Sequence, residues 1–125
     1  MHFGIKEYSF ESRKYSIATE GLCLSDKKNS FVPWDRLYGI GIYPFDTAAS
    51  LQVYDKVICC FLAPVPDNFK HKIFMNPCYY AQRNQDKFVV IDYNEAIIKA
   101  LSDVYHKDIV DYTEGMNGYI RNNSR

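Results

Sequence analysis

The sequence predicts one α+β domain that is mostly β, with a small curved sheet or barrel capped by a single C-terminal α-helix. Apolar and polar residues alternate over much of the first half of the chain, which is typical of half-buried strands. Glycines at positions 39 and 41 interrupt one of these strands, and glycine inside a strand marks a bend or the close approach of another segment. The clearest helical periodicity comes later, over residues 93–107, so a helix follows the strands.

The size and charge of the chain exclude several classes of protein. With 125 residues it can bury one core without disulfides or a metal. Fifteen basic and fifteen acidic residues balance, so no net field draws the chain to nucleic acid or to an anionic membrane. The apolar run 57–63 is too short for a membrane helix, and residues 1–7 do not resemble a secretory signal. We expect a soluble, cytoplasmic protein with one domain over residues 1–112 and a loose tail over residues 113–125.

The first hairpin is predicted around a tight turn at Glu20 and Gly21. Alternating apolar side chains flank this turn at Tyr15, Ile17, Leu22 and Leu24. A hairpin turn needs a residue that adopts positive φ, which Gly21 does without steric cost. A polar loop over residues 26–30 then leads to a strand that begins at Phe31.

Residues 32–37, Val-Pro-Trp-Asp-Arg-Leu, predict a structural corner. Pro33 has no N–H to donate to a sheet, so it belongs at a strand edge, a strand end or a bulge. Trp34 offers the largest apolar side chain available to anchor the corner. Asp35 with Arg36 can be interpreted as a charged site, but an acid here more often accepts backbone N–H bonds and holds the turn. We therefore expect Pro33, Trp34 and Asp35 to be structural anchors, together with Gly21.

Further strands are predicted between residues 38 and 62. Strict alternation marks the first of them at Tyr38, Ile40 and Ile42. A hairpin is then expected to turn at Asp55 and Lys56, between strands at 51–54 and 57–62. The second strand of this hairpin is apolar on both faces, as a central strand would be.

One short helix and one buried strand are predicted between residues 64 and 91. Asp67 is a candidate cap for the helix, and Phe69 and Ile73 lie four residues apart on one side of it. Pro77 is expected to stop this helix. The short apolar run 88–91 then predicts a buried strand.

The C-terminal helix is the best-defined element in the sequence. Its apolar stripe consists of Ile97, Leu101, Val104 and Tyr105. Asp92 and Glu95 have the spacing of a capping box, and His106 and Lys107 are expected in the last turn. Leu101 lies in the middle of the stripe, so we expect it to face the sheet as a further structural anchor.

The four cysteines do not form the C-x-x-C pairs that metal and redox sites favour; they are Cys23, Cys59, Cys60 and Cys78. Neighbouring strand residues face opposite sides of a sheet, so Cys59 and Cys60 are expected on opposite faces. We interpret the cysteines as reduced thiols that pack as small hydrophobic side chains, with a disulfide framework as the alternative.

The segments 15–24, 31–37 and 88–105 together resemble bacterial pleckstrin-homology-like domains. The Glu-Gly turn followed by the Val-Pro-Trp corner is most similar to the YcxB-like domains and related small soluble proteins. This resemblance implies about seven antiparallel strands in two nearly orthogonal sheets, with the helix closing one open end. Eukaryotic relatives that bind phosphoinositides carry a basic cluster in the first hairpin loop, whereas residues 11–14 here are Glu-Ser-Arg-Lys.

No set of residues in the sequence has a catalytic, cofactor-binding or metal-binding pattern. The histidines are dispersed, at His2, His71 and His106. Cys78 with His71 or His106 can be considered as a nucleophile and its base, but neither pair lies in a recognised signature. Lys70, His71 and Lys72 are expected to form a solvated face rather than a phosphate contact.

These observations favour a non-catalytic interaction module with an unknown protein partner, no cofactor and no nucleic-acid partner. The eleven Tyr, eight Phe and one Trp suit core and sheet-face positions, or else an interaction surface. The alternative is a domain that binds a lipid or small ligand in an apolar pocket between sheet and helix. Contact with a membrane surface has weaker support.

Overall fold

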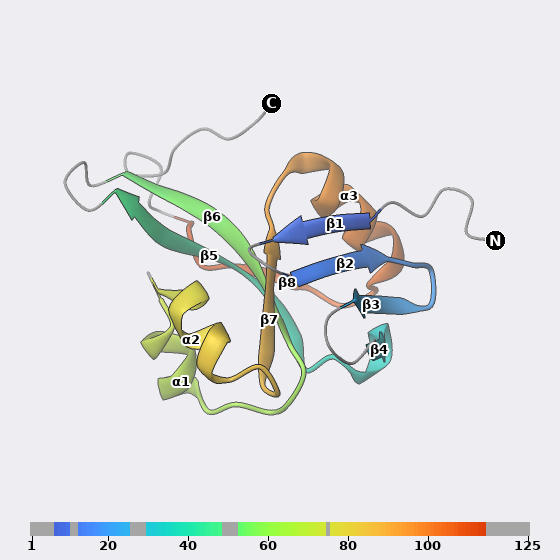
Figure 1. Cartoon of the computed structure of the whole chain (residues 1–125), viewed down its shortest axis with the longest axis horizontal. Helices are drawn as coiled ribbons and strands as arrows, with labels where there is room; N and C mark the ends of the chain where they lie inside the picture. Colours follow the sequence, from blue (N-terminus) through green and yellow to red (C-terminus); the bar gives the residue numbers. More distant parts are fainter. Residues whose placement is uncertain (1–6, 11–12, 26–29, 49–52, 75, 115–125) are drawn as a thin grey trace.

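Two four-stranded sheets and three α-helices make up the described part of the chain (Figure 1). The computed structural model describes residues 7–10, 13–25, 30–48, 53–74 and 76–114. The α+β class is confirmed. The two sheets are separate and do not close into a barrel, so a closed barrel is wrong. Three α-helices accompany the sheets, one more than the C-terminal helix and the short helix that the sequence predicts.

The first sheet is an antiparallel meander in chain order. Its strands are β1 (Glu7–Phe10), β2 (Arg13–Ile17), β3 (Gly21–Ser25) and β4 (Ser30–Pro33). Strands β1 and β4 form the two edges. A single turn of 3-10 helix, η1 (Trp34–Arg36), then carries the chain to the second sheet.

The second sheet has the strand order β7-β6-β5-β8. Its strands are β5 (Gly39–Ala48), β6 (Val53–Phe61), β7 (Phe88–Asp92) and β8 (Ile109–Asp111). β7 confirms the predicted buried strand. β8 runs parallel to β5, so the described strands number eight and are not all antiparallel.

The chain stays packed beyond β8. The Tyr112 N–H donates to the Ile42 carbonyl oxygen at 2.9 Å, and Thr113 is buried. The described fold therefore continues past residue 112, where we expected the tail to begin. Residues 115–125, which make up most of that predicted tail, lie outside the described ranges.

Two short helices connect β6 to β7. α1 (Asp67–Lys72) confirms the predicted short helix, although Pro66 rather than Asp67 occupies its capping position. α2 (Pro77–Arg83) was not predicted, because Pro77 was expected only to stop the preceding helix. Proline is equally suited to begin a helix, since the first helical N–H has no partner in the helix.

The third helix, α3 (Glu95–Val104), is shorter than the predicted span 93–107. Its cap is Asn94, whose Oδ1 accepts the Ile97 N–H at 2.8 Å. The capping box predicted with Asp92 is therefore wrong, because Asp92 ends β7 instead. The predicted stripe is confirmed, with Ile97 and Leu101 fully buried.

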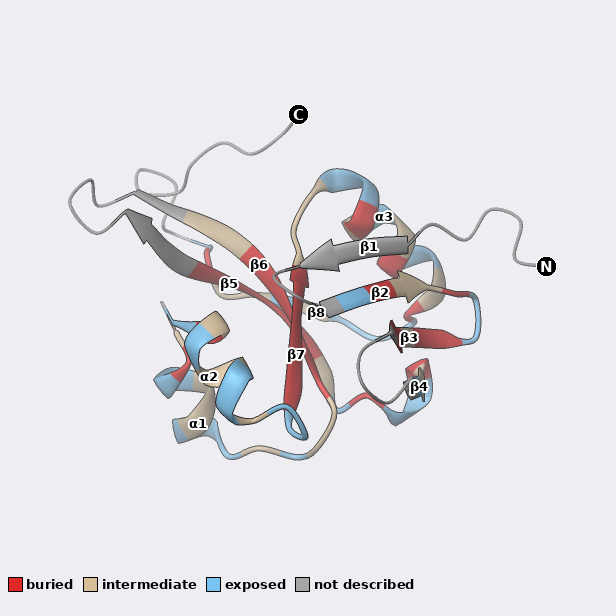
Figure 2. Cartoon of the chain, viewed as in Figure 1, coloured by how far each residue is buried: buried red, intermediate tan, exposed pale blue. Residues whose placement is uncertain are grey.

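Both faces of the second sheet are covered by apolar side chains. Figure 2 shows β7 and the adjoining parts of β5 and β6 as buried. Cys60 belongs to a first cluster with side chains of the first sheet and α3, whereas Cys59 belongs to a second cluster with side chains of α1 and α2. The prediction that Cys59 and Cys60 face opposite sides is confirmed. None of the four cysteines, which all lie in the described ranges, forms a disulfide, and Cys59 and Cys60 are buried. The second sheet is thus the central layer of the fold.

Gly21 is required for close approach and not for a positive φ. The β2–β3 turn is centred on Thr19 and Glu20, with the Ala18 N–H bonded to the Gly21 carbonyl oxygen at 3.0 Å. Gly21 is the first residue of β3, and its φ lies outside the left-handed region. A Cβ at this position would lie 2.9 Å from Pro33 Cα and closer still to the Val32 carbonyl oxygen.

The hairpin predicted at Asp55 and Lys56 does not exist. Both residues lie within β6, opposite Phe45 and Pro44 of β5. β5 is ten residues long and supplies partners well past the apolar run, so β6 continues through this charged pair. The charged residues Asp55 and Lys56 next to the apolar run were interpreted as a turn, whereas the strand β6 continues through them.

The strand glycines have different surroundings. A Cβ on Gly41 would lie 2.9 Å from ring atoms of both Tyr43 and Tyr112, whose rings stack with their centroids 4.6 Å apart. A Cβ on Gly39 would meet only Phe61, at 3.9 Å. Of the two alternatives predicted for these glycines, a bend or a close approach, the close approach is found at Gly41 and not at Gly39.

Candidate functional site: a surface at the Trp34 corner

Trp34 joins the first sheet to the end of α3. Its indole N–H donates to the Ala18 carbonyl oxygen at 2.9 Å, so the polar edge of the ring is satisfied in a buried position. The ring meets that of Tyr105 in an edge arrangement, with a centroid separation of 6.3 Å. Only 7% of Trp34 is exposed. Trp34 therefore lies where a structural anchor was expected.

Pro33 and Asp35 flank the buried tryptophan differently. Pro33 ends β4 opposite Gly21, a position that suits a residue without an N–H. Asp35 is exposed, and within the described ranges no hydrogen bond reaches its carboxylate. The turn is closed by the main chain, since the Leu37 N–H donates to the Trp34 carbonyl oxygen at 3.3 Å. Asp35 consequently does not hold the turn as predicted.

Two neighbouring hollows open on either side of this corner. The larger has a volume of about 670 Å³ and lies between residues 31–38, Leu62 and Lys107. The smaller, of about 450 Å³, lies between the β2–β3 turn and residues 104–107 at the end of α3. Both hollows are lined by Pro33, Asp35 and Lys107. We call the two hollows together the corner surface.

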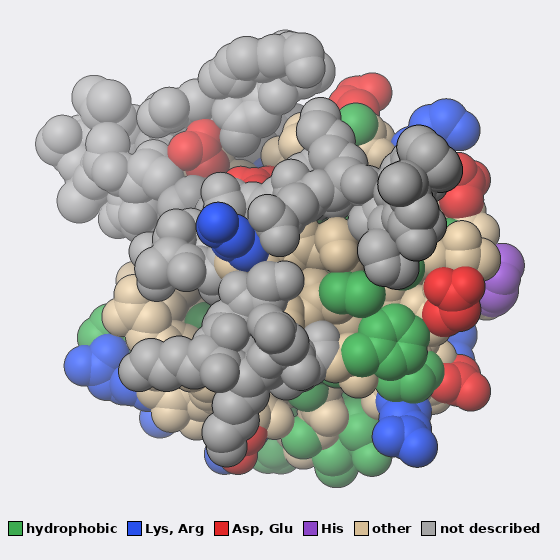
Figure 3. Space-filling view, turned by 45° about the vertical axis from the view of Figure 1, so that its right-hand side comes forward, with side chains coloured by type: hydrophobic (Ala, Val, Ile, Leu, Met, Phe, Trp, Pro, Cys, Tyr) green, Lys and Arg blue, Asp and Glu red, His purple; other side chains and the backbone are tan. Residues whose placement is uncertain are grey.

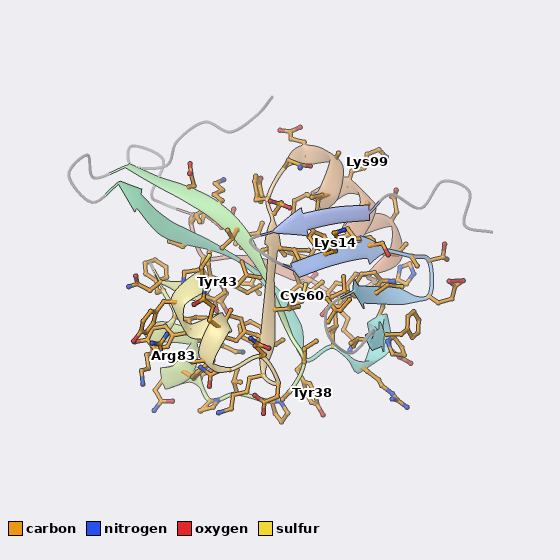
Figure 4. All side chains as sticks on the ribbon, in the orientation of Figure 1. Lys14, Tyr38, Tyr43, Cys60, Arg83 and Lys99 are labelled. Carbon is orange, nitrogen blue, oxygen red and sulfur yellow. The ribbon has the colours of Figure 1, made fainter. Side chains whose placement is uncertain are left out.

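Two exposed aromatic side chains line the larger hollow. Phe31 is 51% exposed and Tyr38 is 61% exposed. The other large hydrophobic residues exposed in the described part of the chain are Tyr79 and Val110. Figure 4 places Tyr38 at the end of the second sheet where β5 begins. Figure 3 turns the side of the first sheet toward the viewer and shows hydrophobic side chains on that face, with charged side chains beside them.

Sequence reasoning missed the exposure of Tyr38. Tyr38 has the same parity as Ile40 and Ile42, both buried, so strand alternation assigns it to the core. The regular strand begins only at Gly39, and Tyr38 precedes it at the corner. No signal in the alternating pattern distinguishes Tyr38 from its buried neighbours.

The rim of the corner surface carries charges of both signs. Arg36 and Lys107 are exposed on the larger hollow together with Asp35. Among the described residues, these three have no partner of opposite charge. A polar rim around an apolar centre is the usual anatomy of a protein interface.

The structure does not bring the considered nucleophile and bases together at the corner. His106 lines the smaller hollow, whereas Cys78 belongs to α2 and packs against the second cluster. His71 is exposed on α1, and His2 lies outside the described residues. Within the described ranges, no three His, Cys, Asp or Glu side chains are placed to hold a metal ion.

The buried thiols have the electrostatics of core side chains. Burial raises the pKa of Cys60 to about 12. The pKa of Cys59 is also raised well above its ordinary value, first by burial and then by the charges of Cys60 and Cys78. A raised pKa disfavours the thiolate, which is the reactive form of cysteine.

None of the helices in the described ranges has the length and apolar character needed to cross a bilayer. Comparison of the chain with models of protein families, with curated proteins and with solved structures finds no match. The resemblance to pleckstrin-homology-like domains therefore stays a prediction from the sequence.

Proposed function

We propose that this chain is a non-catalytic interaction module that binds a protein partner through the corner surface. The observation that carries this proposal is the pair of half-exposed aromatic side chains, Phe31 and Tyr38, on one hollow of about 670 Å³. Aromatic side chains contribute a large share of the binding energy at protein interfaces. The partner places an apolar side chain in the hollow. Its charged groups meet the rim, which carries both positive and negative charges.

Side-chain docking suits this surface better than the addition of a strand. β4 is the neighbouring edge of the first sheet, but it has only four residues and ends in Pro33. A short edge strand that ends in proline is a poor template for pairing with another chain. Affinity is therefore expected to depend on Phe31 and Tyr38 rather than on main-chain pairing.

We also propose that the chain is a pleckstrin-homology-like domain, and the order of its elements is compatible with that fold. Four antiparallel strands, three further antiparallel strands and a helix follow one another in the chain. The two helices between β6 and β7 and the parallel strand β8 are additions to the arrangement that the resemblance implies.

The alternative, a lipid or small ligand between the sheet and the C-terminal helix, has less support. Ile97 and Leu101 fill the contact between α3 and the first cluster and are fully buried. A ligand at that position would have to displace core side chains.

The test uses Tyr38→Ala, with Tyr79→Ala as the matched control because Tyr79 is an exposed aromatic residue on α2. A partner isolated with the wild-type protein is purified, and its Kd is measured with each variant. We expect Tyr38→Ala to weaken binding about tenfold or more and Tyr79→Ala to leave it unchanged. Equal affinity for Tyr38→Ala and the wild type would place the partner on another surface and reject this proposal.

A further inference from the structure

A third hollow lies on the side of the second sheet that α1 and α2 cover, and its lining comes from α1 and from the chain on either side of it. Its volume is about 240 Å³, below the roughly 300 to 1,000 Å³ typical of sites for drug-sized ligands, so only a small molecule fits. The walls are mostly apolar, with Pro64, Val65, Pro66 and Phe69. The polar residues of the lining are Asn68, Lys72 and Lys87.

The lysines of this hollow are held beside aromatic rings. The Lys87 Nζ lies 5.6 Å from the centroid of the Phe69 ring, and the Lys72 Nζ lies 5.5 Å from that of the Tyr80 ring. Cation–π contacts of this kind orient an ammonium group without neutralising its charge. Each lysine therefore remains able to bind an anion.

The surrounding surface has an excess of positive charge. The Lys70 Nζ lies 5.7 Å from the centroid of the Phe61 ring, and the Arg83 guanidinium lies 4.0 Å from that of the Tyr79 ring. Figure 4 labels Arg83 on the side of the molecule where α1 and α2 lie. Among the described residues, none of these four cations has a carboxylate partner; the ion pair found there joins Lys99 and Asp103 on α3. An anion entering the hollow thus meets unpaired positive charge.

We propose that this hollow binds a small organic anion, with its carboxylate or phosphate on Lys72 and Lys87 and its apolar body against Phe69 and the two prolines. The two lysines are 15 positions apart in the chain, and the fold brings both to one hollow whose described lining contains no acid. An apolar wall beside two cations is complementary to a molecule that ends in an anionic group. This site is separate from the corner surface, so either proposal can fail without the other.

The test is calorimetric titration of the full chain with hexyl phosphate and hexanoate, and with neutral hexanol for comparison. We expect an anionic probe to bind, hexanol to bind at least about tenfold more weakly, and affinity to fall as salt rises. Lys87→Gln and Lys72→Gln should each weaken the anion about tenfold, and Lys72→Arg should retain most of the affinity.

Lys99→Gln is the matched control, because Lys99 is an exposed lysine on the remote helix α3. Equal weakening by Lys99→Gln would mean general charge attraction and would overturn the proposal. So would equal affinity for hexanol, or the absence of binding by both anionic probes. Binding only to vesicles that contain anionic lipid, and not to the free anions, would reject a small-molecule site in favour of a membrane surface.

Discussion

The hydroxyl of Tyr15 in β2 donates to the carboxylate of Asp92 at 2.8 Å and accepts the Asp92 main-chain N–H at 3.1 Å. The two residues are 77 positions apart, and their contact joins the first sheet to the end of β7. Burial raises the pKa of Tyr15, and the bond to Asp92 raises it further, so the hydroxyl stays protonated. This contact is a partly buried polar connection between the two sheets.

Tyr15→Phe is expected to lower the free energy of unfolding by about 1–3 kcal/mol, since it leaves the Asp92 carboxylate and N–H without their shared partner. Chemical denaturation measures the change. Tyr38→Phe is the control, because Tyr38 is mostly exposed and the loss of its hydroxyl should leave the midpoint unchanged. A midpoint for Tyr15→Phe equal to the wild-type value would show that the contact adds nothing.

The same contact predicts a dependence of stability on pH. Burial raises the pKa of Asp92 above its ordinary value of about 3.9, although the bond from Tyr15 lowers it in part. The folded state thus binds a proton more tightly than the unfolded state does. The contribution of Asp92 to stability is therefore fully present below the ordinary pKa and is lost as pH rises through the raised pKa.

Denaturation of the wild type and of Asp92→Asn across this range isolates the effect, because asparagine does not titrate. As pH rises from about 4 toward neutrality, the wild type should lose unfolding free energy relative to Asp92→Asn. A difference that stays constant with pH would contradict the raised pKa.

Leu101→Ala should destabilise the fold by about 2–5 kcal/mol, because Leu101 is fully buried and its truncation leaves a cavity between α3 and the first cluster. Lys99→Ala removes a side chain that is 81% exposed and an ion pair on the same helix, so its effect should be within a few tenths of a kcal/mol. Equal denaturation midpoints for the two variants would exclude packing of this helix through its apolar stripe.

Gly21→Ala and Gly39→Ala test the close approach of β3 and β4. A Cβ at position 21 meets the backbone of β4, which cannot move without disturbing the sheet, and we expect a cost of about 1–3 kcal/mol. A Cβ at position 39 finds ordinary contact distance, so that variant should match or slightly exceed the wild type. Thermal unfolding ranks the variants, and a stable Gly21→Ala protein would refute the steric argument.

Trp34 provides an optical test of the corner, since it is the single tryptophan of the chain. Its ring is 7% exposed and packs against Tyr105, so native emission should be blue-shifted and should move to the red on unfolding. Native emission already at the wavelength of exposed indole would instead make Trp34 a surface contact residue.

The corner shows how much of the candidate site follows from sequence. Pro33 and Trp34 were predicted as anchors because the lack of an N–H and the size of a side chain are properties of single residues. Phe31 and Tyr38 could not be recognised as surface residues, because their exposure depends on how the chain turns between two sheets. Asp35 lies at a position in the sequence where an acid often accepts backbone N–H bonds, but here the main chain alone closes the turn.

Local patterns by themselves determined the α+β class, the buried stripe of α3, the strand β7 and the opposite faces of Cys59 and Cys60. Each follows from backbone geometry, which sets the direction of successive side chains along a helix or a strand. Only the tertiary structure decided that β6 runs on through Asp55, that Tyr15 meets Asp92, and that Lys72 and Lys87 line one hollow. Those outcomes depend on which distant segments lie together. The burial and the neighbouring charges of these residues come from those segments and cannot be seen in any local stretch of the sequence.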